Sequence, residues 1–123
     1  MTSIENQRTT KIPYLSSMEA VQEKLSSEQW ILLVFTATWC GPCHAMKPFV
    51  ESLRTTYPTV SVFYIDVDAA EEVSQAFRID SMPTYCLFRG KALVNRFSGA
   101  DKEKLGLMVQ SAVDEGANEI QSQ

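Results

Sequence analysis

Apolar runs along the chain predict five β-strands. Residues 30–35 are apolar without alternation, and residues 60–67 are rich in Val, Phe, Tyr and Ile, which is typical of inner strands. A shorter run contains Pro13, whose missing N–H restricts it to an edge strand or to the start of a strand. Arg89, Gly90 and Lys91 separate the last two runs, which predicts an antiparallel hairpin. The predicted strands are residues 12–15, 30–35, 60–67, 85–88 and 92–97.

Between and after these strands, apolar residues recur at helical spacing. The predicted helices are about residues 16–26, 40–57, 70–77 and 98–116. Ser16 and Glu19 fit a capping box at the start of the first helix. Pro48 lies inside the second helix, where it removes the N–H that would bond the carbonyl of His44, so we expect a kink there. Gly116 is the expected C-cap of the last helix.

The order of the elements, β-α-β-α-β-α-β-β-α, predicts an α/β fold with a mixed central sheet. We expect the sheet to be parallel where helices cross over and antiparallel at the C-terminal hairpin, with helices on both faces. The chain has 123 residues, of which 45% are hydrophobic, and this fits one domain with an ordinary core. The polar residues 1–11 are expected to form a disordered arm, residues 12–116 the domain, and residues 117–123 a frayed tail.

Charge and composition narrow the class of protein. The formal net charge is −4, and no basic run could follow a phosphate backbone, so no nucleic-acid partner is expected. No apolar stretch approaches the roughly 18–20 residues of a membrane span, and the N-terminal residues lack the apolar core of a secretory signal. The expected location is therefore the cytoplasm, with no membrane association. Three cysteines are an odd number, which argues against a structural disulfide framework in a reducing compartment.

Two of the cysteines define the candidate chemistry. Cys40 and Cys43 follow a buried strand and open an amphipathic helix, so their side chains lie on one face, about 5–6 Å apart between Cβ atoms. That separation allows them to join as a disulfide. The N-terminus of the helix presents unpaired N–H groups and the positive end of the helix dipole, which favours a thiolate. Cys40 is therefore predicted to be a nucleophile.

Other interpretations of these cysteines stay open at this point. Cys40 and Cys43 could be inert core thiols, although a Gly-Pro insert at a helix start argues against it. The sequence Cys-x-x-Cys-His also matches the attachment motif of c-type haem, with His44 as the axial ligand, but no export signal accompanies it. A zinc site would need further ligands, and the only ones available are His44 and Cys86, so no metal is expected.

Taken together, the motifs resemble the thioredoxin family over nearly the whole chain, from about Ile12 to Gly116. A lone Cys-x-x-Cys would be moderate evidence, whereas the Trp-Cys-Gly-Pro-Cys form at the end of a buried strand, with a Met-Pro-Thr element about 40 residues later, is a strong match. The features that carry the resemblance are Trp39-Cys-Gly-Pro-Cys43, Pro48, Met82-Pro83-Thr84 and Ser98-Gly99-Ala100.

The resemblance implies a protein disulfide reductase. Cys40 would attack a disulfide of a protein substrate, and Cys43 would resolve the resulting mixed disulfide. No cofactor would be bound, because NADPH would be used indirectly through thioredoxin reductase. Peroxiredoxins are a further expected partner, and the chain is expected to be a monomer. A cis peptide bond would precede Pro83. The substrate-binding surface would comprise Trp39, Gly41, Pro42, Met82, Pro83, Thr84 and Gly99, with Thr84 at its border.

The chain departs from the family pattern close to the second thiol. Family members usually carry a buried Asp where this chain has Val34, and many bacterial members carry a Lys where it has Tyr64. Neither residue can act as a carboxylate base for Cys43. By resemblance, Asp68 bonds the indole of Trp39, and His44, which follows the motif, could modulate the thiols. The rival hypothesis is therefore a redox-sensing or partner-binding module with little turnover.

Overall fold

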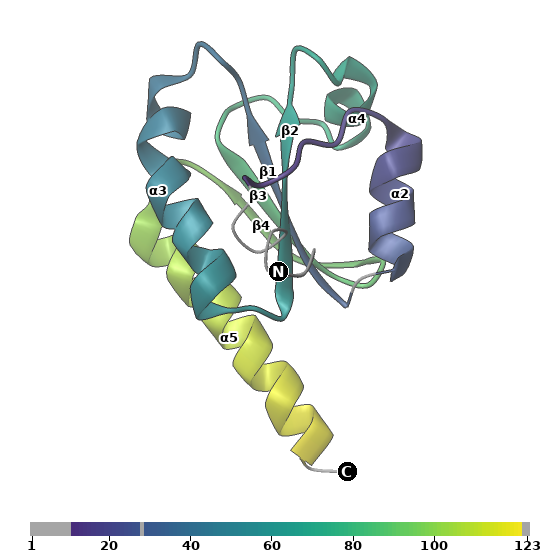
Figure 1. The fold of residues 1–123 in the computed structure, drawn as a ribbon, viewed down its shortest axis with the longest axis vertical. Helices are drawn as coiled ribbons and strands as arrows, with labels where there is room; N and C mark the ends of the chain where they lie inside the picture. Colours follow the sequence, from purple (N-terminus) through teal and green to yellow (C-terminus); the bar gives the residue numbers. More distant parts are fainter. Residues whose placement is uncertain (1–10, 28, 122–123) are drawn as a thin grey trace, which may run out of the picture.

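The computed structural model describes residues 11–27 and 29–121 and contains a four-stranded mixed sheet (Figure 1). The strand order is β2-β1-β3-β4. β1 pairs with β2 in parallel, while β1 with β3 and β3 with β4 are antiparallel. The elements are α2 (Met18–Ser27), β1 (Trp30–Thr36), α3 (Gly41–Thr56), β2 (Val60–Asp66), α4 (Glu71–Ala76), β3 (Thr84–Arg89), β4 (Ala92–Ser98) and α5 (Lys102–Gln121).

Side chains that alternate along the central strand build a separate core on each face of the sheet. Leu32 and Val34 point into a core formed with α3 and α5, whereas Leu33 and Phe35 point into a core formed with α2 and α4. Figure 1 shows α3 and α5 on one side of the sheet and α2 and α4 on the other. Every residue of β1 is buried, which explains why this strand is a continuous apolar run. The predicted α/β fold with helices on both faces is confirmed.

The predicted strand at residues 12–15 is wrong as a full strand. Tyr14 makes only an isolated parallel bridge to Tyr64. Two backbone bonds hold the segment, from Leu15 N–H to the Tyr64 carbonyl at 2.9 Å and from Tyr64 N–H to the Pro13 carbonyl at 3.0 Å. Pro13 has no N–H of its own, so the ladder cannot be completed through it. The expected arm at residues 1–11 lies, except for Lys11, outside the described residues.

The direction of β3 differs from the prediction that helical crossovers give parallel strands. β3 runs antiparallel to β1, and Thr84 at its start faces Phe35 near the carboxyl end of β1. The connecting helix α4 has only six residues, or about 9 Å at 1.5 Å per residue, which is too short to carry the chain back along the sheet. The chain therefore enters β3 from the same edge at which β1 and β2 end.

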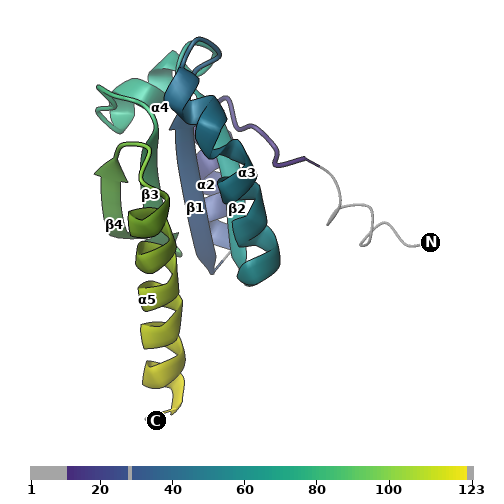
Figure 2. The same cartoon turned by 90° about the vertical axis from the view of Figure 1, so that its left-hand side faces the viewer.

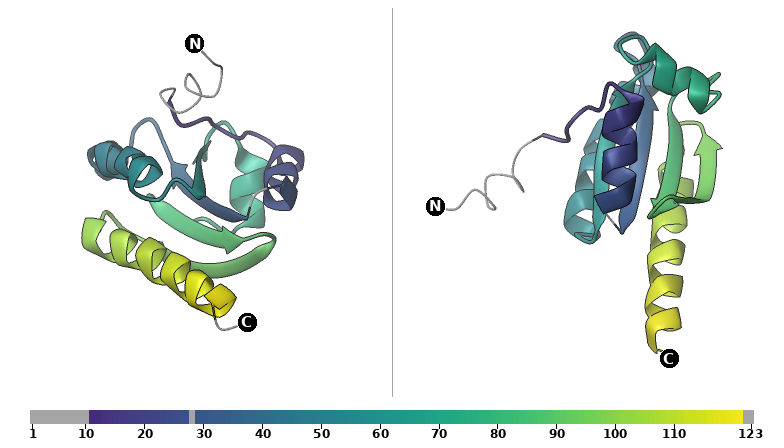
Figure 3. Two further views of the ribbon diagram at one scale, coloured as in Figure 1. Left: turned by 60° about the horizontal axis from the view of Figure 1, so that its bottom comes forward. Right: turned by 90° about the vertical axis from the view of Figure 1, so that its right-hand side faces the viewer.

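Three helix ends also lie elsewhere than predicted: the start of α2 and both ends of α5. Ser17, not Ser16, caps α2, because its hydroxyl accepts from the N–H of Ala20 at 3.1 Å. The last helix starts at Lys102, after Asp101, whose carboxylate accepts from the N–H of Lys104 at 2.9 Å. It continues through Gly116 to Gln121, so Gly116 is not its C-cap. Figure 2 shows α5 extending well past the end of the sheet, and Figure 3 shows it lying across the face formed by β3 and β4.

Candidate active site

The two cysteines of the motif lie where β1 passes into α3, and they form a disulfide. Their Cα atoms are 5.3 Å apart, within the range that a disulfide needs. Cys40 is the N-cap residue of α3, and Pro42 occupies the first turn, where a missing N–H breaks no helical bond. Both cysteines are buried, with 5% and 4% of their surface exposed. The predicted proximity of the two side chains is confirmed.

The environment of Cys40 favours a negatively charged sulfur when the pair is reduced. Its Sγ accepts from the backbone N–H of Cys43 at 3.1 Å, as the side chain of an N-cap does. The N–H of His44 donates to the Cys40 carbonyl at 3.2 Å and closes the first turn. Ala37 and the partly buried Val67 and Met82 pack around the two sulfurs, which keeps them in apolar surroundings. The helix dipole and this N–H donor therefore act on a sulfur that is shielded from water.

The loop before β3 lies directly against Cys40. The peptide bond between Met82 and Pro83 is cis, in agreement with the resemblance. The carbonyl oxygen of Met82 is 3.8 Å from Cys40 Sγ, although these residues are 42 positions apart in sequence. This contact follows from the antiparallel direction of β3, which begins at the edge where β1 delivers the cysteines.

The two residues that follow the cis bond, Pro83 and Thr84, are held by β4 and by the turn after it. The N–H of Gly99 donates to the Pro83 carbonyl at 2.9 Å. The Thr84 hydroxyl contacts the Ser81 carbonyl at 2.7 Å and the Ser98 hydroxyl at 2.6 Å. Thr84 is fully buried, and its side chain supports the loop, so its role in binding substrate stays a prediction. Gly99 has a φ of 122°, a conformation that a residue with a side chain rarely adopts.

Trp39 is the most exposed large apolar side chain of the site. It is 66% exposed, and its indole N–H donates to Oδ2 of Asp68 at 2.8 Å. The hydrogen bond that the resemblance implied is confirmed. Asp68 follows β2, and its own backbone N–H donates to Oδ1 of Asp66 at 2.9 Å. The ring of Trp39 is therefore anchored at the carboxyl ends of two neighbouring strands.

His44 is exposed on the first turn of α3. Its Nε2 donates to the carbonyl of Thr38 at 2.9 Å, so the ring is tied to the segment that leads into the motif. This bond fixes the tautomer with a proton on Nε2 and holds the imidazole beside the active-site turn. Its influence on the thiols stays a prediction.

Below the cysteines, two tyrosines flank the position where the family pattern has a buried Asp. Val34 is 3% exposed, and its partners in register are Tyr64 on β2 and Tyr85 on β3. Both hydroxyls are buried, and neither has a hydrogen-bond partner among the residues that the structure describes. Burial raises the pKa of both tyrosines, for Tyr64 with a contribution from Glu51, so both stay neutral at physiological pH. Sequence reasoning identified Val34 and Tyr64 but missed Tyr85.

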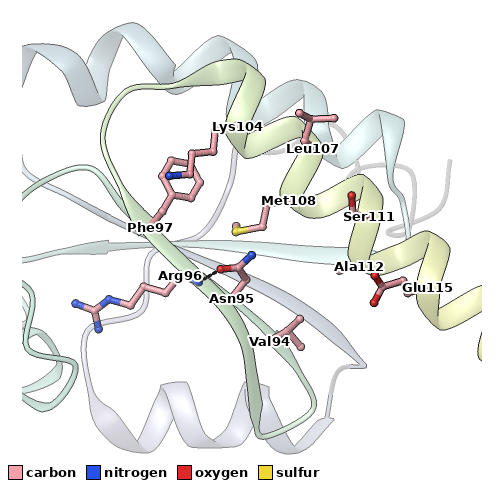
Figure 4. Close-up of a pocket in the computed structure, with 10 residues that line it drawn as sticks. All are labelled: Val94, Asn95, Arg96, Phe97, Lys104, Leu107, Met108, Ser111, Ala112 and Glu115. Atoms are coloured by element: carbon pink, nitrogen blue, oxygen red, sulfur yellow. Dashed lines mark hydrogen bonds between the residues drawn. The ribbon is translucent and has the colours of Figure 1, made fainter.

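The remaining cysteine and a groove beside β4 both lie away from this site. Cys86 is fully buried in the α2/α4 core, and burial raises the pKa of its thiol to about 11. Among the described residues no group of three or more His, Cys, Asp and Glu side chains could hold a metal ion. A groove of about 510 Å³ lies between β4 and α5, and neither motif cysteine lines it (Figure 4). Within residues 11–27 and 29–121, no helix has the length and apolar character to cross a membrane.

Comparison with known proteins identifies the family of this chain. The thioredoxin family model matches residues 14–111. Thioredoxin of the horse, Equus caballus, is 38% identical over 104 residues, which cover 83% of this chain and 99% of the horse protein. Mitochondrial thioredoxin 3 of Saccharomyces cerevisiae in its oxidized form has a TM-score of 0.79 at 27% identity, covering 81% of this chain and 94% of its own.

A further solved structure comes from work on the thiol resolving mechanism in yeast mitochondrial 1-Cys peroxiredoxin via glutathione/thioredoxin systems. That chain has a TM-score of 0.79 at 26% identity, and the match covers 82% of this chain and 95% of that one. The mixed sheet, the bonded cysteine pair and these matches agree with one another. The chain belongs to the thioredoxin family and is a dithiol–disulfide oxidoreductase with the Cys40–Cys43 pair as its redox centre.

Proposed function

We propose that Cys40 is the attacking thiol and Cys43 the resolving thiol in the reduction of protein disulfides. The Cys40 thiolate attacks one sulfur of the substrate disulfide, and the other sulfur leaves as a thiolate. Cys43, once deprotonated, attacks Cys40 Sγ and releases the second substrate thiol. The substrate gains two electrons, and the protein is left with the Cys40–Cys43 disulfide that the structure contains.

The observation that carries this assignment is the position of Cys40 as the N-cap of α3. Its sulfur accepts from the Cys43 N–H at 3.1 Å, and this bond strengthens when the sulfur becomes a thiolate. Cys43 lies within the first turn, and its Sγ is bonded to Cys40 Sγ, so it is within reach of the sulfur that it would attack. The exposed Trp39 directly precedes Cys40, which places the nucleophile at the border of an accessible surface.

The substrate-binding surface of this proposal surrounds Cys40. Trp39, Gly41 and Pro42 are exposed, and Met82 and Gly99 are partly buried beside them. Pro83 is buried and shapes the surface from below. A flat apolar surface of this kind accepts extended segments of many sequences because it relies on area more than on individual side-chain pockets.

The complete cycle needs a source of two electrons. We assign that role to a thioredoxin reductase that draws on NADPH, so the chain itself needs no bound cofactor. Peroxiredoxins are a candidate class of substrate, supported by the similarity to a structure from the yeast peroxiredoxin work. We also propose that the chain acts as a monomer. A reducing compartment such as the cytoplasm suits this cycle, because it keeps the resting protein in the dithiol form.

The second step is expected to be atypical in rate. Val34 is apolar, and the tyrosines beside it are neutral, so no carboxylate at this position assists the loss of the Cys43 proton. The first step does not depend on that base. We therefore propose a working disulfide reductase with a slower resolving step, and a sensing or binding module with little turnover is not favoured.

A turnover assay tests this function. Reduction of insulin-type disulfides by dithiothreitol is measured with the wild type, with Cys40→Ser and with Cys86→Ala as a control cysteine outside the site. The proposal predicts catalysis by the wild type and by Cys86→Ala and none by Cys40→Ser. Clean binding of the substrate protein without turnover by the wild type would favour the binding module instead.

A further inference from the structure

The segment between α4 and β3 presents Met82 to Cys40, and it is held in place by one strand at both of its ends. At its far end, Ser98 and Gly99 contact Thr84 and Pro83, as described above. At its near end, the contact comes from Arg96, which lies two residues earlier on β4. β4 therefore touches the segment before and after residues 79–82.

Arg96 binds the two carbonyl groups at the end of α4. One guanidinium nitrogen donates to the carbonyl of Phe77 at 2.5 Å, and the other donates to the carbonyl of Arg78 at 3.1 Å. Carbonyls at the end of a helix lack partners within the helix and carry its negative dipole, so a cation that donates two hydrogen bonds is well matched to them. The planar fork of arginine suits two neighbouring acceptors better than the single ammonium of lysine does.

The turn that Arg96 binds is one that needs support. Arg78 has a φ of 55°, a left-handed conformation that is uncommon for residues other than glycine. Within the turn itself, the N–H of Arg78 donates to the carbonyl of Gln75 at 3.0 Å, and the N–H of Ile79 donates to the carbonyl of Ser74 at 2.9 Å. Arg96 adds the contact from another element, which fixes the turn relative to the sheet.

The side of β4 from which Arg96 projects agrees with this role. Figure 4 shows the guanidinium pointing away from Leu107 and Met108, whereas Phe97 lies on the α5 side. Phe97 packs against the α3/α5 core. Alternation along the strand thus sends the guanidinium of Arg96 toward α4, while Arg96 also contributes to the lining of the groove between β4 and α5.

We propose that Arg96 is a positioning residue for the substrate-binding segment. By anchoring the start of residues 77–83 to β4, it keeps Met82 and Pro83 against Cys40 in the orientation that a protein substrate meets. The role rests on the proposed function of this surface in binding protein disulfides. Arg96 takes no part in the thiol chemistry itself.

The test combines kinetics with hydrogen exchange. Arg96→Met keeps the aliphatic stem and removes the donors, and Arg96→Lys restores one cation. Lys91→Met, which changes an exposed cation in the hairpin turn before β4, is the matched control. In Arg96→Met, KM for a protein disulfide should rise about fivefold, the effect of losing a charge-assisted hydrogen bond at a solvent-exposed site. In the same variant, kcat and the rate with a small aromatic disulfide should stay unchanged. Arg96→Lys should lie between Arg96→Met and the wild type.

Hydrogen exchange followed by mass spectrometry supplies the second readout. Amides of residues 79–82 should exchange faster in Arg96→Met than in Lys91→Met, with the exchange of β1 and β2 unchanged. Unchanged exchange at residues 79–82, or an equal rise in KM in the Lys91 control, would overturn the proposal. If the wild type failed to turn over protein disulfides, the proposed function would fail, whereas the exchange result would still decide the anchoring role of Arg96.

Discussion

Replacing Asp68 by Ala removes the carboxylate that anchors the indole of Trp39 and leaves the cysteine pair untouched. The hydrogen bond is 2.8 Å long and has a charged acceptor. Such bonds contribute about 1.5–3 kcal/mol. Because Asp68 is exposed and Trp39 is 66% exposed, solvent competes for both groups, and we expect the contribution to fall to about 1 kcal/mol. If a bound protein needs the anchored ring, this energy corresponds to a rise in KM of about fivefold.

The assay is the reduction of a protein disulfide at several substrate concentrations, with kcat and KM measured separately. KM should rise in Asp68→Ala and kcat should stay the same, because the lost contact stabilises the bound substrate and the transition state equally. Asp114→Ala, which changes an exposed acid on α5, is the matched control. Trp39→Phe removes the N–H, so adding Asp68→Ala to it should cause no further rise in KM. Additive effects of the two changes would refute the anchoring argument.

Three further predictions concern the interior. Tyr85→Phe should stabilise the protein by about 1 kcal/mol in urea unfolding, because its buried hydroxyl has no partner among the described residues; destabilisation would show that the hydroxyl is satisfied. Val34→Asp should speed the resolving step in single-turnover assays relative to Val34→Asn, since only the former offers a base to Cys43, and equal rates would remove the idea. Burial raises the pKa of Cys86 to about 11, so above pH 9 the folded protein keeps a proton that the unfolded chain loses. The free energy of unfolding should therefore fall as pH rises from about 9 to 11, and Cys86→Ala should abolish this part of its pH dependence.

Features that depend on residues close together in the sequence could be predicted well. The apolar run of β1 and the helical spacing in α3 and α5 depend on neighbours within a few residues, and the structure confirms these elements. The motif around Cys40 is also local, because the N-cap geometry and the first helical turn bring its two sulfurs together. The resemblance supplied the cis bond before Pro83, which the physics of the residues alone did not indicate.

Features that depend on pairing between distant strands could not be predicted in this way. The antiparallel direction of β3 follows from the short length of α4. The spacing of apolar residues does not determine the direction of a strand. Tyr85 becomes a neighbour of Val34 only through the register of β3 with β1. Arg96 contacts the end of α4 across 18 and 19 positions in sequence, so only the folded chain brings these groups together. The cap at Ser17 instead of Ser16 was missed because adjacent serines offer the same side chain.

The central claim is that Cys40 attacks and Cys43 resolves, and trapping the mixed disulfide tests it most directly. Cys43→Ser is incubated in reduced form with an oxidised protein substrate, and covalent complexes are separated without reductant and mapped by mass spectrometry. The account predicts a stable complex joined through Cys40 in this variant and no complex with Cys40→Ser. A complex joined through Cys43 in Cys40→Ser, or through Cys86 in either variant, would contradict it.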